Sequence, residues 1–283
     1  MYDNALLLEG GAMRGLYTAG VLDAFMEAGL EFGCVYGVSA GVLNAVNYVA
    51  RQPGRSANVN YTCINDRRYL SMTNLLHGQS IFNFDYLFNQ VPLSIPFDYD
   101  AFSASPQRLI AVATNCLTGE PVLFEKGRCA QFFDACAASC SMPLVSRVKL
   151  VEGIPCLDGG VSAPVPLDVG LKTGNGRPVL VLTRHKGYRK TPLSRRSLRL
   201  SAIRCRRYPA LYKLMSSAPE RYNELMERID ALEAAGQIFV IRPETPIEIA
   251  RLEKDVNKLR ALHDSAYAQT KSLLPALMEF CAQ

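Results

Sequence analysis

The sequence predicts an α/β protein, a three-layer α/β/α sandwich with a mostly parallel central sheet and a smaller helical C-terminal region. Short apolar runs of strand length alternate with segments of helical periodicity, which favours parallel strands covered by helices. The first two of these strands each end at a glycine-rich turn, and the second turn carries a serine. With 49% hydrophobic and 20% charged side chains, the 283 residues are typical of a globular protein with its own core.

The N-terminal part of the chain shows the alternation most clearly. Ala5–Leu8 is an apolar run that stops at a glycine-rich turn, and Leu16–Met26 has apolar side chains at helical spacing. Gly29 is placed to end that helix as a C-cap residue. We expect Phe32–Val38 to form the next strand and the residues after Gly41 to form the next helix.

The middle of the chain is less regular. Pro53–Asp100 is rich in Asn, Tyr and Phe and contains several turn signals, so we expect loops and short helices there. Beyond it, the expected elements are a helix at 129–139 and strands at 109–114, 122–125, 145–151, 154–157 and 178–183. The strands at 145–151 and 154–157 should form a hairpin.

The composition changes near Arg184, where basic residues become frequent. This change divides the chain into a main α/β domain, residues 1–183, and a mainly helical region packed on it, residues 184–283. In the second part, the pattern predicts helices at 219–235 and 247–262 and a strand at 238–241. Thr245 is the expected N-cap of the last helix, and Pro246 suits its first turn.

The basic residues are unevenly distributed along the chain, whose net charge is +5. Between Val169 and Pro219 there are 13 lysines and arginines and no Asp or Glu. Such asymmetry indicates an anionic partner, either lipid head groups or nucleic acid. The alternative is a solvated face whose counter-charges lie elsewhere in the fold. Because no nucleic-acid-binding motif accompanies the charge, we favour lipid, with contact through the basic region Arg184–Lys213.

The chain has no apolar run of the ~18 residues that a membrane span needs. It begins Met1-Tyr2-Asp3-Asn4, without the basic start of a secretory signal, and its nine cysteines show no paired spacing. The expected location is therefore the cytoplasm, with possible peripheral contact at the inner face of the membrane. Cys136 and Cys140 lie four residues apart, but no second pair completes a metal site. The oligomeric state is not indicated by the sequence.

The strongest chemical signal is Gly37-Val38-Ser39-Ala40-Gly41, which matches G-x-S-x-G at a predicted strand-to-helix junction. A nucleophile held in such a tight turn needs small residues two positions on either side. The turn presents the serine hydroxyl at the N-terminus of the next helix, where free N–H groups favour a developing oxyanion. Ser39 is thus a candidate nucleophile.

Two further glycine-rich turns follow predicted strands. Gly10-Gly11-Ala12-Met13-Arg14-Gly15 fits neither the phosphate loop nor the dinucleotide fingerprint, but its glycines allow backbone N–H groups to approach a ligand oxygen. On its own it could equally be a tight turn without a ligand. Asp158-Gly159-Gly160 could be a simple turn or a catalytic carboxylate with close access.

Taken together and in this order, the three motifs resemble those of the patatin-like phospholipase family. A fourth element, Ala138-Ser139-Cys140-Ser141-Met142-Pro143, is similar to the family's A-S-x-x-x-P block, and the resemblance covers Leu6–Pro166. Arg242-Pro243 and Ile249–Glu253 are similar to the bacterial branch of the family that carries an extra C-terminal region.

The resemblance implies a hydrolase of fatty-acyl esters, with phospholipid or lysophospholipid as substrate, without metal or cofactor. Its catalytic pair would be a nucleophilic serine and a general-base aspartate without histidine, which are Ser39 and Asp158 here. Backbone N–H groups of Gly10, Gly11 and Ala12 would form the oxyanion hole, with Arg14 supporting the loop. The supporting glycines would be Gly37, Gly41, Gly159 and Gly160. The family's Gly-Gly-Gly start is replaced by Glu9-Gly10-Gly11, so Glu9 is not expected to be a donor position.

Other interpretations remain open from the sequence. The order Ser39, Asp158, His185 mimics an α/β-hydrolase triad, although the serine turn comes early for that fold and a basic stretch follows the histidine. We expect His77, His185 and His263 to be structural or surface residues. A carboxylesterase of water-soluble esters, an acyltransferase with the same dyad, and a regulatory protein with little turnover are the alternative functions.

Overall fold

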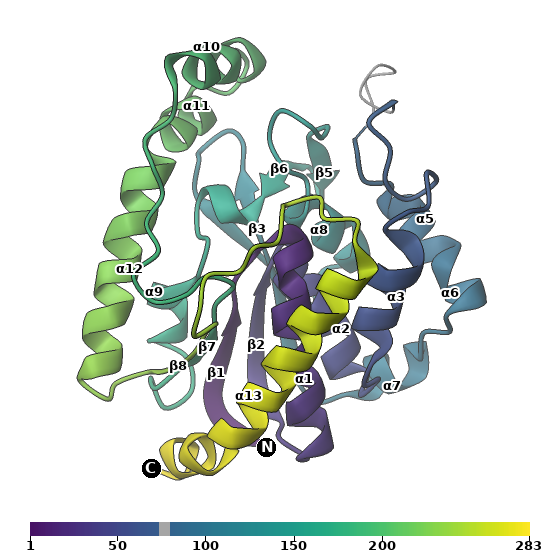
Figure 1. Ribbon diagram of the computed structural model, residues 1–283. Helices are drawn as coiled ribbons and strands as arrows, with labels where there is room; N and C mark the ends of the chain where they lie inside the picture. The colour runs from purple at the N-terminus through teal and green to yellow at the C-terminus, as the bar shows by residue number, and fades with distance from the viewer. Residues whose placement is uncertain (74–79) are drawn as a thin grey trace.

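The computed structural model describes residues 1–73 and 80–283, and their strands form one eight-stranded mixed sheet (Figure 1). The sheet order is β5-β6-β3-β2-β1-β7-β8, with β4 pairing beside β3. The strands are β1 Tyr2–Leu8, β2 Phe32–Val38, β3 Arg108–Asn115, β4 Pro121–Glu125, β5 Lys149–Val151, β6 Ile154–Asp158, β7 Val179–Val181 and β8 Phe239–Ile241.

The centre of the sheet is parallel, as predicted. β3, β2, β1, β7 and β8 run in one direction, while β4 and β6 pair antiparallel with β3 and β5 pairs antiparallel with β6. The carboxyl ends of the parallel strands therefore meet at one edge, where ligand sites of open α/β sheets lie.

Helices cover both faces, which confirms the three-layer architecture. Alternate residues of β1 face opposite ways: Leu6 and Leu8 belong to one hydrophobic core, and Ala5 and Leu7 to the other. The first core is covered by α1 Gly15–Glu27, α2 Ala40–Val49, α8 Phe132–Ser139 and α13 Val256–Ala282. The second is covered mainly by α9 Leu167–Gly170 and α12 Ala218–Ala234.

The segment between α2 and β3 forms short helices and loops beside α2, as expected (Figure 1). Its described helices are α3 Arg55–Cys63, α5 Phe84–Asn89, α6 Val91–Ser94 and α7 Tyr99–Ala104. His77 lies outside the described residues.

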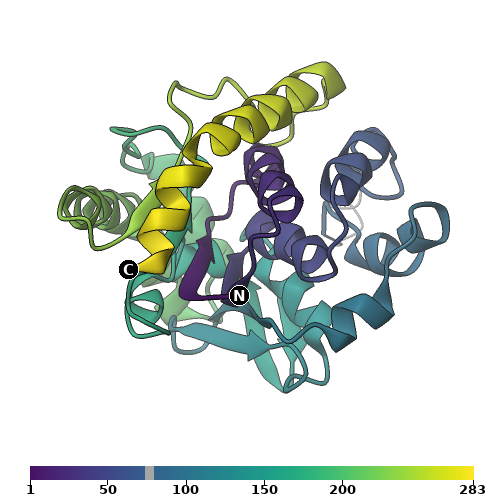
Figure 2. The ribbon, with the colours of Figure 1, turned by 90° about the horizontal axis from the view of Figure 1, so that it is seen from below.

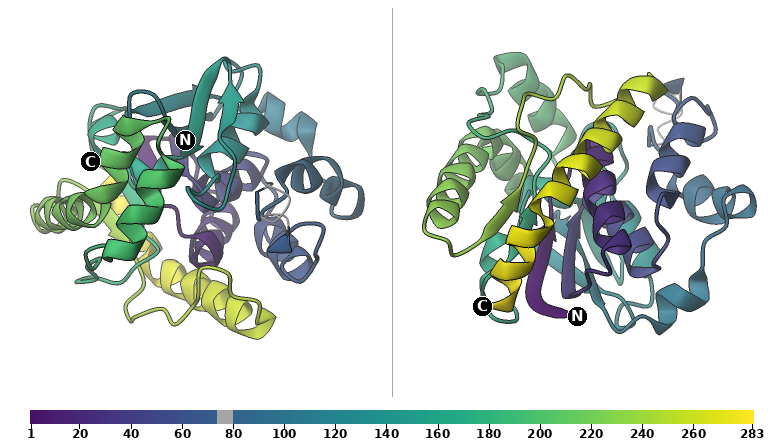
Figure 3. Two further views of the ribbon diagram at one scale, coloured as in Figure 1. Left: turned by 90° about the horizontal axis from the view of Figure 1, so that it is seen from above. Right: turned by 60° about the horizontal axis from the view of Figure 1, so that its bottom comes forward.

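The C-terminal hundred residues add a strand to the same sheet and helices that pack around it. β8 pairs with β7, and α13 packs along α1, where a Cβ on Gly20 would lie only 2.2 Å from the carbonyl oxygen of His263. The chain begins and ends at one end of the molecule (Figure 2). Helices α10 Arg195–Arg204 and α11 Pro209–Ser216 lie at the opposite end, above the carboxyl ends of the parallel strands (Figure 3).

The start of the helix predicted at 247–262 is wrong, whereas 256–262 are helical. Residues 247–255 are irregular, and α13 begins at Val256, because the carboxylate of Asp255 caps it by accepting from the N–H groups of Asn257 and Lys258. Thr245 and Pro246 are therefore not its start, and His263 lies within α13. The expected strand at 145–151 is reduced to β5, and the expected helix at 129–139 begins only at Phe132.

All nine cysteines have free thiols and are buried. Across residues 1–73 and 80–283, no helix has the length and apolar character needed to cross a membrane.

Candidate active site

Ser39 is the single residue that connects the end of β2 to the start of α2. Its backbone is in a strained conformation, with φ 53° and ψ −125°. A side chain in the left-handed region costs of order 1–3 kcal/mol, and such strain is found mostly at functional sites. The turn is held from the side by Ser139, whose Oγ accepts from the Ser39 N–H at 2.9 Å and donates to the Val112 carbonyl at 2.6 Å. The fold thus fixes the direction of the Ser39 hydroxyl.

The glycines around Ser39 are required by close packing. A Cβ on Gly37 would lie 2.4 Å from the Cα of Val42, and one on Gly41 would lie 2.5 Å from the carbonyl oxygen of Leu8. Both contacts involve backbone atoms, which cannot turn aside as a flexible side chain would. The strand–turn–helix junction therefore tolerates only glycine at these two positions.

Asp158 ends β6 and is brought to Ser39 by the pairing of β6 with β3. The Ser39 Oγ donates to Asp158 Oδ2 at 3.0 Å, and the Gly160 N–H donates to Asp158 Oδ1 at 2.7 Å. Gly159 turns the chain directly against β3, since its Cβ would lie 2.1 Å from the carbonyl oxygen of Val112. Both oxygens of the Asp158 carboxylate therefore accept a hydrogen bond, and Oδ2 is oriented toward the Ser39 hydroxyl.

Burial raises the pKa of Asp158 from 3.8 to about 6, because the side chain is only 8% exposed. The hydrogen bonds from Gly160 and Ser39 and the positive charges of Arg251 and Lys190 act in the opposite direction. A carboxylate with this pKa is a better match to neutral pH than a solvated aspartate, and it remains ionised at pH 7.

The glycine-rich turn after β1 lies beside the serine. A Cβ on Gly10 would lie 2.9 Å from the Cβ of Ser39, so the backbone there passes directly over the nucleophile. Among the described residues, no acceptor is found for the N–H groups of Gly10 and Gly11. Ala12 follows with a positive φ of 48°. The turn thus offers free backbone donors within reach of the Ser39 hydroxyl.

Glu9, which replaces the family's first glycine, points away from this turn. Its carboxylate accepts from the Thr183 N–H at 2.7 Å, from the Thr183 Oγ1 at 3.1 Å and from the Tyr222 hydroxyl at 2.9 Å. The buried Glu9 carboxylate therefore connects the glycine-rich turn to Thr183, just after β7, and to Tyr222 of α12. The side of the turn that faces Ser39 consists of backbone groups. Burial raises the pKa of Tyr222, and the nearby Glu9 adds to that shift.

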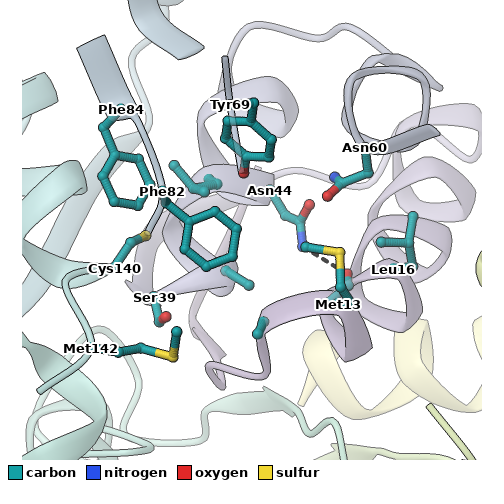
Figure 4. A pocket seen from close by; sticks show the side chains of 14 residues that line it. Met13, Leu16, Ser39, Asn44, Asn60, Tyr69, Phe82, Phe84, Cys140 and Met142 are labelled. Carbon is teal, nitrogen blue, oxygen red and sulfur yellow. Dashed lines mark hydrogen bonds between the residues drawn. The ribbon is translucent and has the colours of Figure 1, made fainter. Parts of the chain in front are cut away.

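Two cavities meet at Ser39. The first is apolar and opens between the serine turn and the α3–α5 segment, with Ser39 and Met142 on one side and Tyr69 and Asn60 on the other (Figure 4). This apolar cavity is narrow, about 50 Å³. It adjoins a further cavity of about 60 Å³ that does not reach Ser39, and the two share Leu43, Asn44, Asn60 and Tyr69.

The second cavity at Ser39 has a volume of about 490 Å³. It lies on the other side of the serine and is lined by Asp158, Arg14 and several further basic side chains.

Neither His185 nor His263, the two histidines in the described part of the chain, joins the pair. The His185 ring packs edge-on against Tyr188 with 6.0 Å between centroids, and it makes no hydrogen bond to Ser39 or Asp158 in the part of the chain that the structure describes. His263 contacts Asp23 and Asp264 at the α1–α13 interface, 2.9 Å from each carboxylate. Residues 1–73 and 80–283 also contain no cluster of three or more His, Cys, Asp or Glu side chains arranged to hold a metal ion.

The family model of the patatin-like phospholipases matches residues 6–171, more than half of the chain. The chain belongs to the patatin-like phospholipase family. A domain family of unknown function matches residues 208–282, the extra C-terminal region. The patatin-like domain places the protein among the lipid acyl hydrolases in general.

A curated relative of this patatin-like chain is the uncharacterized protein YjjU of Escherichia coli, 26% identical over 265 residues that cover 90% of this chain and 72% of YjjU. Among solved structures, VipD from Legionella pneumophila overlaps 98% of this chain and 67% of its own, with a TM-score of 0.48 and 13% identity.

Several residues of this patatin-like site were not found from the sequence. Ser139 was noted only as part of a motif, and its contact with Ser39 spans 100 positions. Glu9 was noted only as a departure from the motif, and its partner Tyr222 lies 213 positions away. Lys190 belongs to the basic region Arg184–Lys213 and Arg251 to the Ile249–Glu253 segment, and neither segment carries a local signal that places these side chains in the cavity beside Asp158.

Proposed function

We propose that the chain is a serine acyl hydrolase that cleaves fatty-acyl esters of phospholipids or lysophospholipids. The observation that carries the proposal is the 3.0 Å hydrogen bond from the strained Ser39 to the buried Asp158, at the point where an apolar and a cationic cavity meet. Residues 1–183 would carry the chemistry, and residues 184–283 would complete the cavity wall.

In the proposed mechanism, Asp158 Oδ2 takes the proton from Ser39 Oγ as that oxygen attacks the ester carbonyl. The negative oxygen of the tetrahedral intermediate is stabilised by the N–H groups of Gly10 and Gly11, with Ala12 and Arg14 completing and supporting the loop. Asp158 then returns the proton to the leaving alkoxide, and an acyl-serine remains. Water, activated by the same carboxylate, attacks the acyl-serine and releases the fatty acid and free Ser39.

The acyl chain would enter the apolar pocket of Figure 4. Its walls include Met13, Leu16, Phe82, Phe84 and Met142, which offer no charge to the chain. Because this pocket is narrow, with a volume of about 50 Å³, a longer chain must displace side chains or continue past Leu43 and Tyr69 into the adjoining cavity.

The direct test is fatty-acid release by the purified protein from a lysophospholipid and from a water-soluble ester of the same acyl chain. We expect both to be hydrolysed, with the lysophospholipid preferred. Hydrolysis of the soluble ester alone would favour the carboxylesterase alternative. Acyl transfer to glycerol in place of water would favour the transferase, and no turnover of either substrate would contradict the proposal.

The activity should depend on the ionisation of Asp158. Since the base works only when it is deprotonated and its pKa in the free protein is raised to about 6 by burial, kcat/KM for a water-soluble ester should rise with pH through about 6 and level off above pH 7. The measurement is a pH–rate profile between pH 4.5 and 8 under conditions where the fold is intact. An inflection near pH 4, as for a solvated carboxylate, would contradict the role of the buried Asp158.

The residues of the basic region lie in different environments in the structure, and Arg184 and Lys190 line the cavity beside Asp158. Lys186 and Arg189 contact Glu233 and Asp230 of α12, at 3.0 and 3.4 Å, as the counter-charge alternative expects. The arginines of α10 and its C-terminal turn have no carboxylate partner among the described residues; they are Arg195, Arg196, Arg199, Arg204, Arg206 and Arg207. Beside them, Leu200 and Ile203 are 47% and 73% exposed. We propose that this helix docks on an anionic bilayer at the inner face of the membrane.

Reversing two of these charges tests the docking. Arg195→Glu with Arg196→Glu should weaken sedimentation with anionic liposomes severalfold, because each cation near the surface contributes about 1 kcal/mol at best. Hydrolysis of a water-soluble ester should be unaffected. Equal binding to neutral and anionic liposomes, insensitive to salt, would contradict the membrane contact and leave the arginines as solvated surface charges.

A further inference from the structure

The cavity on the Asp158 side of Ser39 is unusually rich in cations. Arg14, Arg184, Lys190 and Arg251 all line it, from three separate parts of the chain. Only two acids share the lining: Asp158, which binds Ser39 and Gly160, and Glu9, which binds Thr183 and Tyr222. Four cations therefore face two carboxylates that are already engaged by protein donors.

None of the four cations has a side-chain hydrogen bond or an ion pair with a carboxylate in the described part of the chain. The Arg184 guanidinium stacks on Tyr188 at 4.2 Å, and the Lys190 ammonium lies over the Tyr222 ring at 3.8 Å. By contrast, Arg242, which is about as buried as Arg14 but lies outside the cavity, contacts both Asp230 and Glu233. The fold thus pairs a buried cation elsewhere but leaves those of this cavity free.

Burial disfavours the charged form of two of these cations, Arg14 and Lys190. Arg14 is only 7% exposed and its Nε has no partner, and burial together with Arg184 and Arg251 lowers its pKa to about 10. Burial also lowers the pKa of Lys190 to about 8, against the opposing effect of Glu9. Unpaired buried charge is unfavourable, so its presence in a solvent-accessible cavity points to a ligand that supplies the missing negative charge.

We infer that this cavity binds the phosphate of the substrate head group, with Lys190, Arg184 and Arg251 as its ligands. The inference rests on the proposed function and assigns the side chains that would recognise the phosphate of its phospholipid or lysophospholipid substrate. Charge-assisted hydrogen bonds from guanidinium and ammonium groups are the usual recognition of phosphate oxygens. The hydroxyl groups of Thr191, Ser197 and Ser201 line the same cavity and add donors.

The arrangement explains why Ser39 lies between two different cavities. An acyl chain in the apolar pocket and a phosphate in the cationic cavity would place the ester between them, at the nucleophile. Arg184, Lys190 and Arg251 line the same cavity as Ser39 and Asp158, so a phosphate held there would be part of a substrate that reaches the nucleophile. The apolar pocket would bind the acyl chain and the cationic cavity the phosphate, and together they would fix the orientation of the substrate.

The test compares two substrates that differ only in the phosphate: 1-decanoyl-glycerol 3-phosphate and 1-decanoylglycerol, both as dissolved monomers. The wild type should have the higher kcat/KM for the phosphorylated substrate. In Lys190→Gln the ratio of the two kcat/KM values should fall about tenfold, the usual effect of losing one charge-assisted contact, and in Arg251→Gln it should fall similarly. Lys190→Arg should keep the ratio within a few-fold of the wild type.

The matched control is Arg67→Gln, which removes one exposed charge outside both cavities and should leave the ratio unchanged. Thermal unfolding of each variant shows whether it is folded, and Lys190→Gln should be at least as stable as the wild type because it removes a buried charge. A ratio that stays constant in both Lys190→Gln and Arg251→Gln would overturn the inference while leaving the hydrolase intact.

Binding to Ser39→Ala separates the inference from turnover. By calorimetry, the phosphorylated lipid should bind at least tenfold more tightly than 1-decanoylglycerol, and Lys190→Gln in the same background should remove most of that difference. This result would support the phosphate site even if the proposed hydrolysis failed. Equal binding of the two lipids would overturn it. If inorganic phosphate bound as tightly as the phosphorylated lipid, the cavity would recognise free phosphate, and the assignment to a substrate head group would be wrong.

Discussion

Replacing Ser39 by alanine should reduce ester hydrolysis by at least about 10⁴-fold, to the residual rate that binding and the free N–H groups alone support. The hydroxyl is the only group at the strained turn that can form the acyl intermediate, and alanine removes it without adding bulk. The Oγ donates to Asp158, which Gly160 also holds, so the fold should be unaffected by its loss. The measurement is fatty-acid release under single-turnover conditions, with circular dichroism and thermal unfolding for the fold.

The matched control is Ser162→Ala. Ser162 lies close to the same strand end, with its Oγ 2.8 Å from that of Thr114, but it does not line either cavity at Ser39. It should keep most of the activity. If Ser162→Ala were inactive and Ser39→Ala active, the nucleophile would be wrongly assigned.

Asp158→Asn should reduce kcat by about 10² to 10⁴-fold, the usual contribution of a positioned base. The amide keeps the shape of the carboxylate and can still accept from the Gly160 N–H, but it cannot take the proton of Ser39. The residual rate should also lose its inflection near pH 6. The measurement is the pH–rate profile of the variant beside that of the wild type.

His185→Ala is the control for this variant. The ring packs on Tyr188 and makes no contact with Asp158, so nearly full activity should remain. An inactive His185→Ala together with an active Asp158→Asn would replace the dyad by a histidine-dependent mechanism.

Local signals explain why much of the fold and the catalytic pair could be predicted. Gly37 and Gly41 are needed because the turn packs closely on Val42, a few residues away, and on Leu8 of the neighbouring strand. The spacing of the two glycines in the sequence therefore predicts the geometry of the turn. The alternation of strands and helices in the first half of the chain is equally local. The Asp158 motif was ambiguous by itself, and only its combination with the other motifs favoured a site.

The errors arose where one local signal competed with another. Thr245 and Pro246 form a plausible helix start, but Asp255 caps the real helix, and the preceding residues cross over the glycine-rich turn instead. There the carbonyl of Arg251 accepts from the Met13 N–H at 3.4 Å. That contact joins residues more than two hundred positions apart, and no pattern within either segment indicates it.

The cationic cavity illustrates the same limit. The excess of basic residues between Val169 and Pro219 is visible in the sequence, but it does not show which charges are paired. In the structure Lys186 and Arg189 contact acids, Lys190 faces the cavity, and the arginines of α10 face solvent. One charged stretch thus has three different environments, which are set by tertiary contacts.

The central claim is that Ser39, activated by Asp158, attacks the ester carbon, and covalent labelling tests it most directly. The wild type should be labelled by a fluorophosphonate probe, and mass spectrometry of the digested protein should find the phosphonyl group on the peptide that contains Ser39. Asp158→Asn should be labelled at least about 10²-fold more slowly, since its serine lacks a base. Labelling of any other serine, or labelling of Ser39 at an equal rate in Asp158→Asn, would contradict the account.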